Sequence, residues 1–164
     1  MFKPHSLHWL LTATLALSAA ACADDHDHDH ADESPEAEAC EHLSDGPAQA
    51  VLAVAAEEVA GLPDISKSHT RFDVTLPGDA GKLAGYVKFV STKSGDTLLV
   101  ANADVPMQLV DGTGAAVQPK SEATSQAGCA AVKRRAVYTL GVATYRLKLG
   151  PTATSTVGLL FEAL

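Results

Sequence analysis

Aromatic side chains and clusters of positive charge are both scarce in this sequence. Aromatic residues make up 5% of the 164 residues, and the formal net charge is −8. Neither value favours base stacking or phosphate contact, so we do not expect nucleic acid as a partner. The sequence also lacks Gly-x-Ser-x-Gly, His-Glu-x-x-His, a phosphate-binding loop and a dinucleotide fingerprint. We therefore expect a protein that is not an enzyme.

Hydrophobic runs long enough for a permanent transmembrane helix, about 20 apolar residues, are absent as well. The longest apolar stretch runs from Trp9 to Leu17, after Lys3, and ends in the small residues Ser18 to Ala21. A basic start, a short apolar stretch and a small-residue end are the parts of a secretory signal peptide. The sequence thus predicts a signal peptide over residues 1–21 and an exported protein.

The residues around Cys22 fit two kinds of cleavage site. Ala19-Ala20-Ala21 before Cys22 resembles the lipobox of bacterial lipoproteins, with Ala19 where those proteins usually have Leu, while Ala21-Cys22-Ala23 fits an ordinary Ala-x-Ala site. We favour the first reading. The resemblance implies that Cys22 is acylated and anchors the chain in the cell envelope of a bacterium. Ala23 then implies the outer membrane, with the domain in the periplasm or at the cell surface.

Lysine and arginine are missing from residues 22–45, which contain ten acidic residues, whereas residues 46–164 contain ten acidic and eleven basic ones. A segment with this charge and little aliphatic bulk cannot offset its ordering entropy by burial. We expect a disordered His/Asp/Glu-rich tail over residues 22–39 and one folded domain over residues 40–164.

Histidine alternates with aspartate directly after Cys22. The candidate metal ligands there are Asp25, His26, Asp27, His28, Asp29 and His30. Imidazole suits Zn²⁺, Cu²⁺ and Ni²⁺, and carboxylates add oxygen ligands and a negative field. Such tracts resemble the His-rich loops of periplasmic zinc-uptake proteins, which implies metal capture or buffering, zinc first, with a metal transporter or another envelope protein as a partner. The alternative is a solvated spacer.

Two cysteines remain once Cys22 is acylated or removed. In an exported domain, Cys40 and Cys129 are expected to form a disulfide. The alternative is a metal site of Cys40, His42 and Cys129, because Cys40-Glu41-His42 places two zinc ligands close together. With the disulfide formed, His42 remains a candidate ligand beside the tail.

The domain itself has a period of two. Phe72, Val74 and Leu76 alternate with polar residues, and further strands are expected over 85–91, 97–101, 105–109, 115–117, 136–140, 144–149 and 156–162. About eight short strands separated by turns predict an all-β fold with a single β-sandwich. Residues 47–60 fit either a helix or an edge strand, and we favour the strand. His69 and the run 133–135 are expected to be ordinary solvated residues at strand ends.

The run from Tyr138 to Leu147, with Leu98-Leu99-Val100 and Val110 to Gly114 before it, resembles bacterial pre-peptidase C-terminal type domains. This resemblance implies a jelly-roll-like sandwich that accompanies secreted enzymes and binds surfaces or ligands. It supports a second functional hypothesis, a non-catalytic module that binds a protein or glycan and uses the tail as an acidic tether.

Overall fold

The computed structural model describes residues 34–56 and 61–164. The predictions for the signal peptide, for acylation of Cys22 and for the metal tract of residues 25–30 lie outside these ranges. Among the described residues, no helix is both long enough and apolar enough to cross a bilayer.

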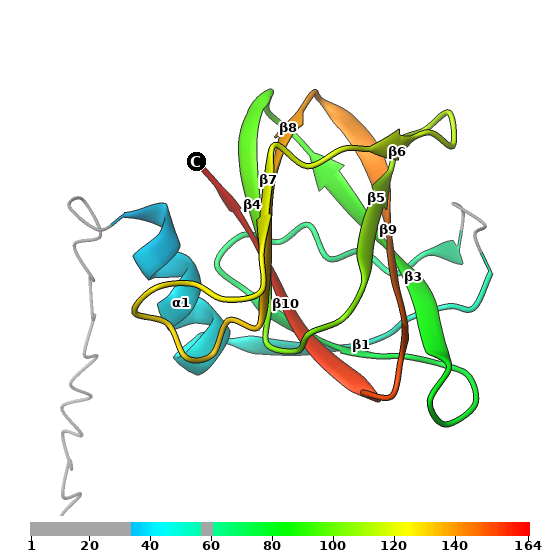
Figure 1. The fold of residues 1–164 in the computed structure, drawn as a ribbon. Helices are drawn as coiled ribbons and strands as arrows, with labels where there is room; N and C mark the ends of the chain where they lie inside the picture. The colour runs from blue at the N-terminus through cyan, green and yellow to red at the C-terminus, as the bar shows by residue number, and fades with distance from the viewer. Residues whose placement is uncertain (1–33, 57–60) are drawn as a thin grey trace, which may run out of the picture.

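Two β-sheets face one another, which confirms the prediction of an all-β sandwich (Figure 1). The larger sheet has the strand order β1 (Ala48–Leu52), β2 (Arg71–Thr75), β10 (Thr156–Ala163), β4 (Gly95–Ala101), β8 (Arg134–Leu140) and β7 (Ser121–Ala123). The smaller sheet has the order β3 (Leu83–Ser91), β9 (Ala143–Thr152), β5 (Met107–Val110) and β6 (Ala116–Val117). All pairs are antiparallel except β1 and β2, which run parallel.

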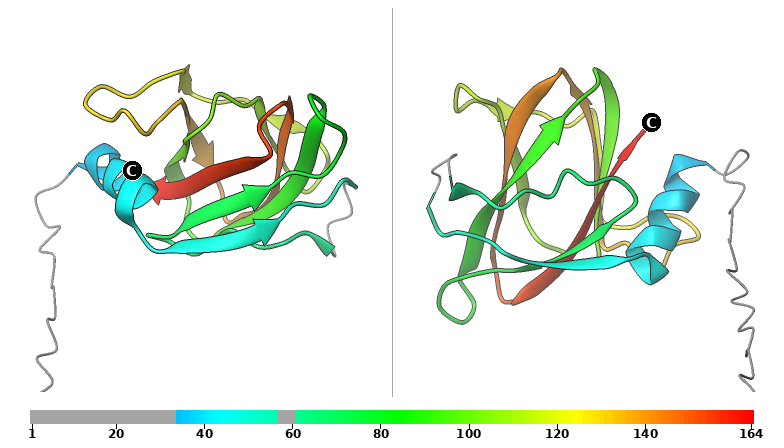
Figure 2. Two further views of the ribbon diagram at one scale, coloured as in Figure 1. Left: turned by 90° about the horizontal axis from the view of Figure 1, so that it is seen from below. Right: turned by 180° about the vertical axis from the view of Figure 1, so that it is seen from behind.

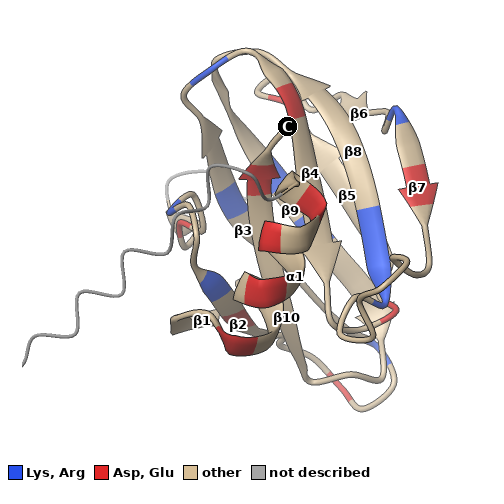
Figure 3. Cartoon of the chain, turned by 90° about the vertical axis from the view of Figure 1, so that its left-hand side faces the viewer, with Lys and Arg blue, Asp and Glu red and all other residues tan. Residues whose placement is uncertain are grey.

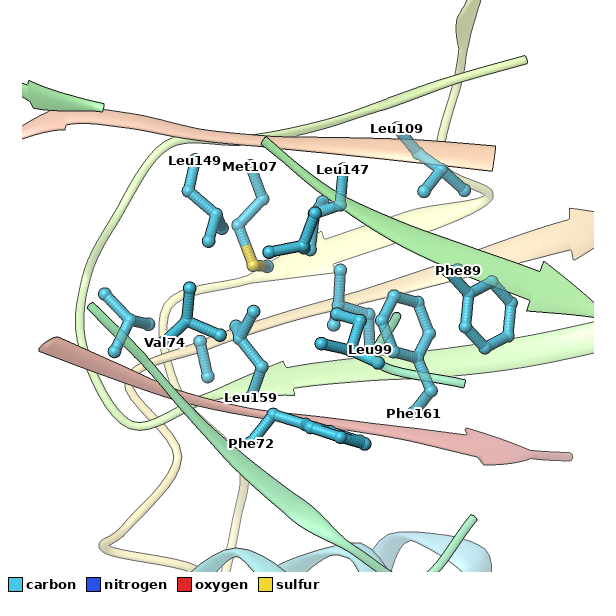
Figure 4. Packing of buried hydrophobic residues seen from close by; sticks show 14 of the residues in the cluster. Phe72, Val74, Phe89, Leu99, Met107, Leu109, Leu147, Leu149, Leu159 and Phe161 are labelled. Carbon is cyan, nitrogen blue, oxygen red and sulfur yellow. The ribbon is translucent and has the colours of Figure 1, made fainter. Parts of the chain in front are cut away.

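The core lies between the sheets and is made by alternate residues of each strand. In β9, three alternate residues, Tyr145, Leu147 and Leu149, are all buried in it. At one end of the core, Phe89 of β3 and Phe161 of β10 stack with ring centroids 3.9 Å apart (Figure 4). Burial of each large apolar side chain here contributes about 1.5–3 kcal/mol to the stability of the fold.

A second apolar layer covers the outer face of the larger sheet. The helix α1 (Pro35–Asp45) packs there, with Ala39 and Leu43 against outward-facing residues such as Leu98 and Leu160. This helix explains why β4 is apolar on both faces: alternate residues point into the sandwich, and the others lie under α1. The carboxyl end of β10 lies beside the helix (Figure 2).

The helix corrects the predicted boundary of the tail, because disorder was expected as far as residue 39. Ser34 caps the helix by accepting a hydrogen bond from the Ala37 amide, Pro35 occupies the first turn, and Glu36 and Glu38 complement the helix dipole there. The serine–proline pair therefore marks the start of a helix within the segment that was expected to be disordered.

Most other predicted elements are confirmed. Residues 48–52 form the expected edge strand, and the eight predicted strands are all present. One further short strand, β7, lies between β6 and β8, and its three residues are exposed. An exposed strand has no apolar alternation, so the period-two pattern could not reveal it.

Candidate metal centre

Two potential metal ligands stand one turn apart on α1. Glu38 and His42 have the spacing i, i+4, which brings side chains to the same helix face. The carboxylate Oε1 lies 3.6 Å from the imidazole Nε2. Ala39 and Leu43 hold the neighbouring face against the sheet, so the pair is fixed at the helix flank rather than pointing freely into water.

His69 comes from the segment that leads into β2. This segment is tied to β3 by the Ile65 amide, which donates to the Lys88 carbonyl, and by the Val90 amide, which donates to Ser66 Oγ. His69 itself has φ 51°, in the left-handed region that few non-glycine residues adopt. The turn therefore holds the imidazole of His69 over the helix flank.

The three side chains converge on one point. His69 Nδ1 lies 2.8 Å from Glu38 Oε1, and the His42 and His69 rings meet edge to face with centroids 5.1 Å apart. One ligand atom from each of the three residues lies within 4.8 Å of the other two. Ligands of a tetrahedral zinc ion are about 3.4 Å apart at bonds of about 2.1 Å. Three ligand atoms at this spacing could hold one metal ion.

Glu162, on β10, borders the same cluster. It follows Leu160 on the outward face of the strand, and its Oε1 lies 3.7 Å from His69 Nδ1. The residue is 6% exposed. Burial raises the pKa of Glu162 above its ordinary value and the charge of Glu38 adds to the rise, whereas His69 opposes it through its charge and its backbone amide.

Contacts at both ends hold α1 on the sheet. The Arg71 guanidinium donates to the carbonyls of Leu43 and Ser44 at 3.2 Å each, where the helix dipole favours a cation. Near the other end, Gln126 Nε2 donates to the Glu36 carbonyl at 2.6 Å. Figure 3 shows acidic residues along α1 and basic residues on β8, and Arg135 of β8 lies 3.8 Å from Glu36 of the helix.

The predicted disulfide is confirmed: Cys40 of α1 is bonded to Cys129. The sulfur atoms are therefore bonded to each other, and the alternative metal site of two cysteines and His42 is not formed. Cys40 lies between Glu38 and His42 in the sequence, so the covalent link is made in the middle of the turn that presents both ligands.

Of the predicted ligands, the structure places His42 in the cluster, while the tract of residues 25–30 lies outside the described ranges. Glu38 and His69 were missed. The helix start at Ser34-Pro35 was a signal for Glu38, since it puts Glu38 and His42 on one face. No local pattern marks His69, because its role arises from the tertiary fold.

The basic run 133–135 was expected to be solvated, and two of its residues are engaged in ion pairs. Arg134 lies 3.5 Å from Asp104 and 3.7 Å from Glu122. Arg135 faces Glu36 of the helix as described above.

No protein-family model matches this chain, and no curated protein matches its sequence.

Proposed function

We propose that this chain is an exported protein, anchored in a bacterial envelope through an acylated Cys22, that binds a divalent transition metal ion, preferably zinc. The observation that carries the proposal is the convergence of Glu38, His42 and His69. Two imidazoles and a carboxylate are a ligand set that zinc accepts, and copper or nickel also suits the imidazoles.

The surroundings of the three ligands support this proposal. The side chains of Glu38 and His42 are 18% and 14% exposed, so both are largely withdrawn from water. Glu162 adds a second carboxylate at the edge of the cluster. A divalent cation would offset the negative charge that these two groups bring into a partly buried site.

The N-terminal His/Asp tract adds a second metal-binding part to this proposal. The His/Asp tract ends at His30, eight residues before Glu38 in the sequence. We assign the tract to gathering metal ions and the folded centre to holding one of them. A chelator and a preformed site in tandem suit capture or buffering, with release to a metal transporter or another envelope protein.

Competition for Zn²⁺ against a chromophoric chelator tests both parts. Four forms of the exported chain are compared. The first is unchanged, and the second, the tail variant, has Ser in place of His26, His28 and His30. The third, the centre variant, carries His42→Gln and His69→Gln, and the fourth carries all five changes. We expect the tail variant to keep one tight site and the centre variant to lose it. Equal zinc uptake by the unchanged chain and the centre variant would refute the folded site, and equal uptake by the unchanged chain and the tail variant would remove the tract from the proposal.

A matched pair of substitutions on α1 provides the control for charge. Glu38→Gln removes a ligand, whereas Glu41→Gln removes the same charge from a helix position outside the cluster. We expect Glu38→Gln to weaken zinc binding at least tenfold and Glu41→Gln to leave it nearly unchanged. Equal effects would mean that general negative charge, rather than coordination, attracts the ion.

A further inference from the structure

A cavity of about 390 Å³ adjoins the metal centre. Glu38, His69 and Glu162 form one part of its wall. The stacked rings of Phe89 and Phe161, at the end of the core, form an apolar part (Figure 4). The volume lies in the range of pockets that hold small molecules.

The count of ligands leaves one coordination position open. Glu38, His42 and His69 supply three ligand atoms that all lie near one another, but Glu162 is not part of that group. A zinc site with three protein ligands keeps its fourth position for water or for an added ligand. Since two of the three ligand residues also line the cavity, that position is accessible from it.

Glu162 carries the second observation. Its Oε1 is buried and accepts no hydrogen bond from the described residues, because His69 Nδ1, at 3.7 Å, lies beyond hydrogen-bond distance. A buried acceptor without a donor is costly, by about 1–3 kcal/mol and more when charged. A ligand in the cavity with a hydroxyl or amino group near its metal-binding atom would donate to the carboxylate of Glu162, which lines the cavity wall.

The cavity wall also carries a cation. Lys93 lines it, and within residues 34–56 and 61–164 no carboxylate forms an ion pair with its ammonium group. The bound metal ion and Lys93 together would attract an anion, whereas without the metal ion the carboxylates of Glu38 and Glu162 would repel one. Binding of an anion here thus requires the metal ion.

We propose that the loaded centre binds a small carboxylate through the open position, with a hydroxyl or amino group next to the carboxylate donating to Glu162 and with Lys93 facing the bound anion. This inference rests on the proposed metal site. The ligand class is that of small 2-hydroxy and 2-amino acids, whose apolar part would lie against Phe89 and Phe161.

The test uses the full exported chain with His26, His28 and His30 replaced by Ser, so that metal binds at the folded centre. The chain is loaded with Co²⁺, whose visible absorption reports its ligands, and titrated with glycolate and with acetate. We expect both acids to change the spectrum, glycolate at the lower concentration. No uptake of Co²⁺ overturns the metal site and this inference together. Uptake with a spectrum that neither acid changes overturns this inference alone.

Substitutions of Glu162 and of Lys93 test the two proposed contacts of the bound acid separately. Glu162→Leu, which places an apolar side chain on the same strand face as Leu160, is expected to reduce the preference for glycolate over acetate about tenfold, the worth of one hydrogen bond to a charged group. Glu162→Gln keeps an acceptor and is expected to retain part of this preference. It replaces Glu162→Leu in the test if the leucine variant does not fold. Lys93→Ala is expected to weaken both acids, whereas Lys82→Ala, at an exposed turn, leaves them unchanged. An undiminished preference in both Glu162 variants would refute the donor contact.

Discussion

Glu38 on α1 and His69 before β2 meet across the boundary between the helix and the larger sheet, with His69 Nδ1 2.8 Å from Glu38 Oε1. The ligands come from two elements that are joined by tertiary contacts rather than by a short loop. The position of α1 on the sheet therefore determines whether the centre exists. Whatever loosens the helix is expected to weaken metal binding, even where no ligand is changed.

The disulfide gives the first prediction. Cys40→Ser with Cys129→Ser opens a covalent link that spans 89 residues. The chain-entropy model gives such a loop about 4.5 kcal/mol, so we expect the free energy of unfolding in urea to fall by about 3–4.5 kcal/mol. Zinc affinity, measured by chelator competition, should fall as well, because Glu38 and His42 are presented by the released helix.

Reduction of the unchanged protein by a dithiol is the control for this double variant, and it should shift unfolding and zinc affinity in the same direction. Unchanged zinc affinity in a folded double variant would show that the packing of Ala39 and Leu43 is sufficient to hold α1.

The second prediction concerns Arg71, which contacts no ligand of the centre but caps the last turn of α1. Arg71→Ala leaves the carbonyls of Leu43 and Ser44 without this donor. We expect a loss of about 1–2 kcal/mol in the free energy of unfolding and a severalfold weaker binding of zinc. Arg71→Lys should recover part of both, since it keeps the charge but not the planar fork. Stability lost without any change in zinc affinity would contradict a positioning role.

The sheets were predictable because their strands alternate. Phe72 and Val74 in β2, like Leu147 and Leu149 in β9, repeat with period two, and each is buried as that pattern requires. The disulfide was predictable from the expected export of the chain and from the two cysteines that follow Cys22.

The helix and the centre were harder to predict. The acidity of residues 22–45 indicated disorder and drew attention away from the helix cap at Ser34. The helix α1 also has only two buried residues, Ala39 and Leu43, so its apolar pattern is weak. His69 is a lone histidine whose neighbours in space, Glu38 and Glu162, lie far from it in sequence. Such convergence depends on how the helix packs on the sheet, which no local pattern encodes.

Gly150 gives the third prediction. It lies in β9 with φ +89°, opposite an irregularity of β3 between Leu83 and Gly85. A Cβ at this position would collide with the Leu83 carbonyl and would crowd Ala84. We expect Gly150→Ala to lower the free energy of unfolding by about 2–4 kcal/mol, from backbone strain and overpacking together.

Gly112→Ala is the matched control for Gly150→Ala, because no atom lies within 4 Å of the added Cβ and its φ is not in the left-handed region. It should change the free energy of unfolding by less than about 0.5 kcal/mol. Similar losses in the two variants would refute the steric argument.

The last prediction concerns Tyr138 of β8, which is 1% exposed in the core. Burial raises the pKa of its phenol to about 12 from 10.0. Because the folded state holds this proton more tightly than the unfolded state, the stabilisation is complete below pH 10 and is lost as the pH rises toward 12. A difference of two pKa units corresponds to about 2–3 kcal/mol in the free energy of unfolding. Urea unfolding followed from pH 9 to 12 should therefore show a steeper loss of stability in the unchanged protein than in Tyr138→Phe, which lacks the titrating group. Parallel curves would mean that the phenol ionises in the folded protein as readily as in the unfolded chain.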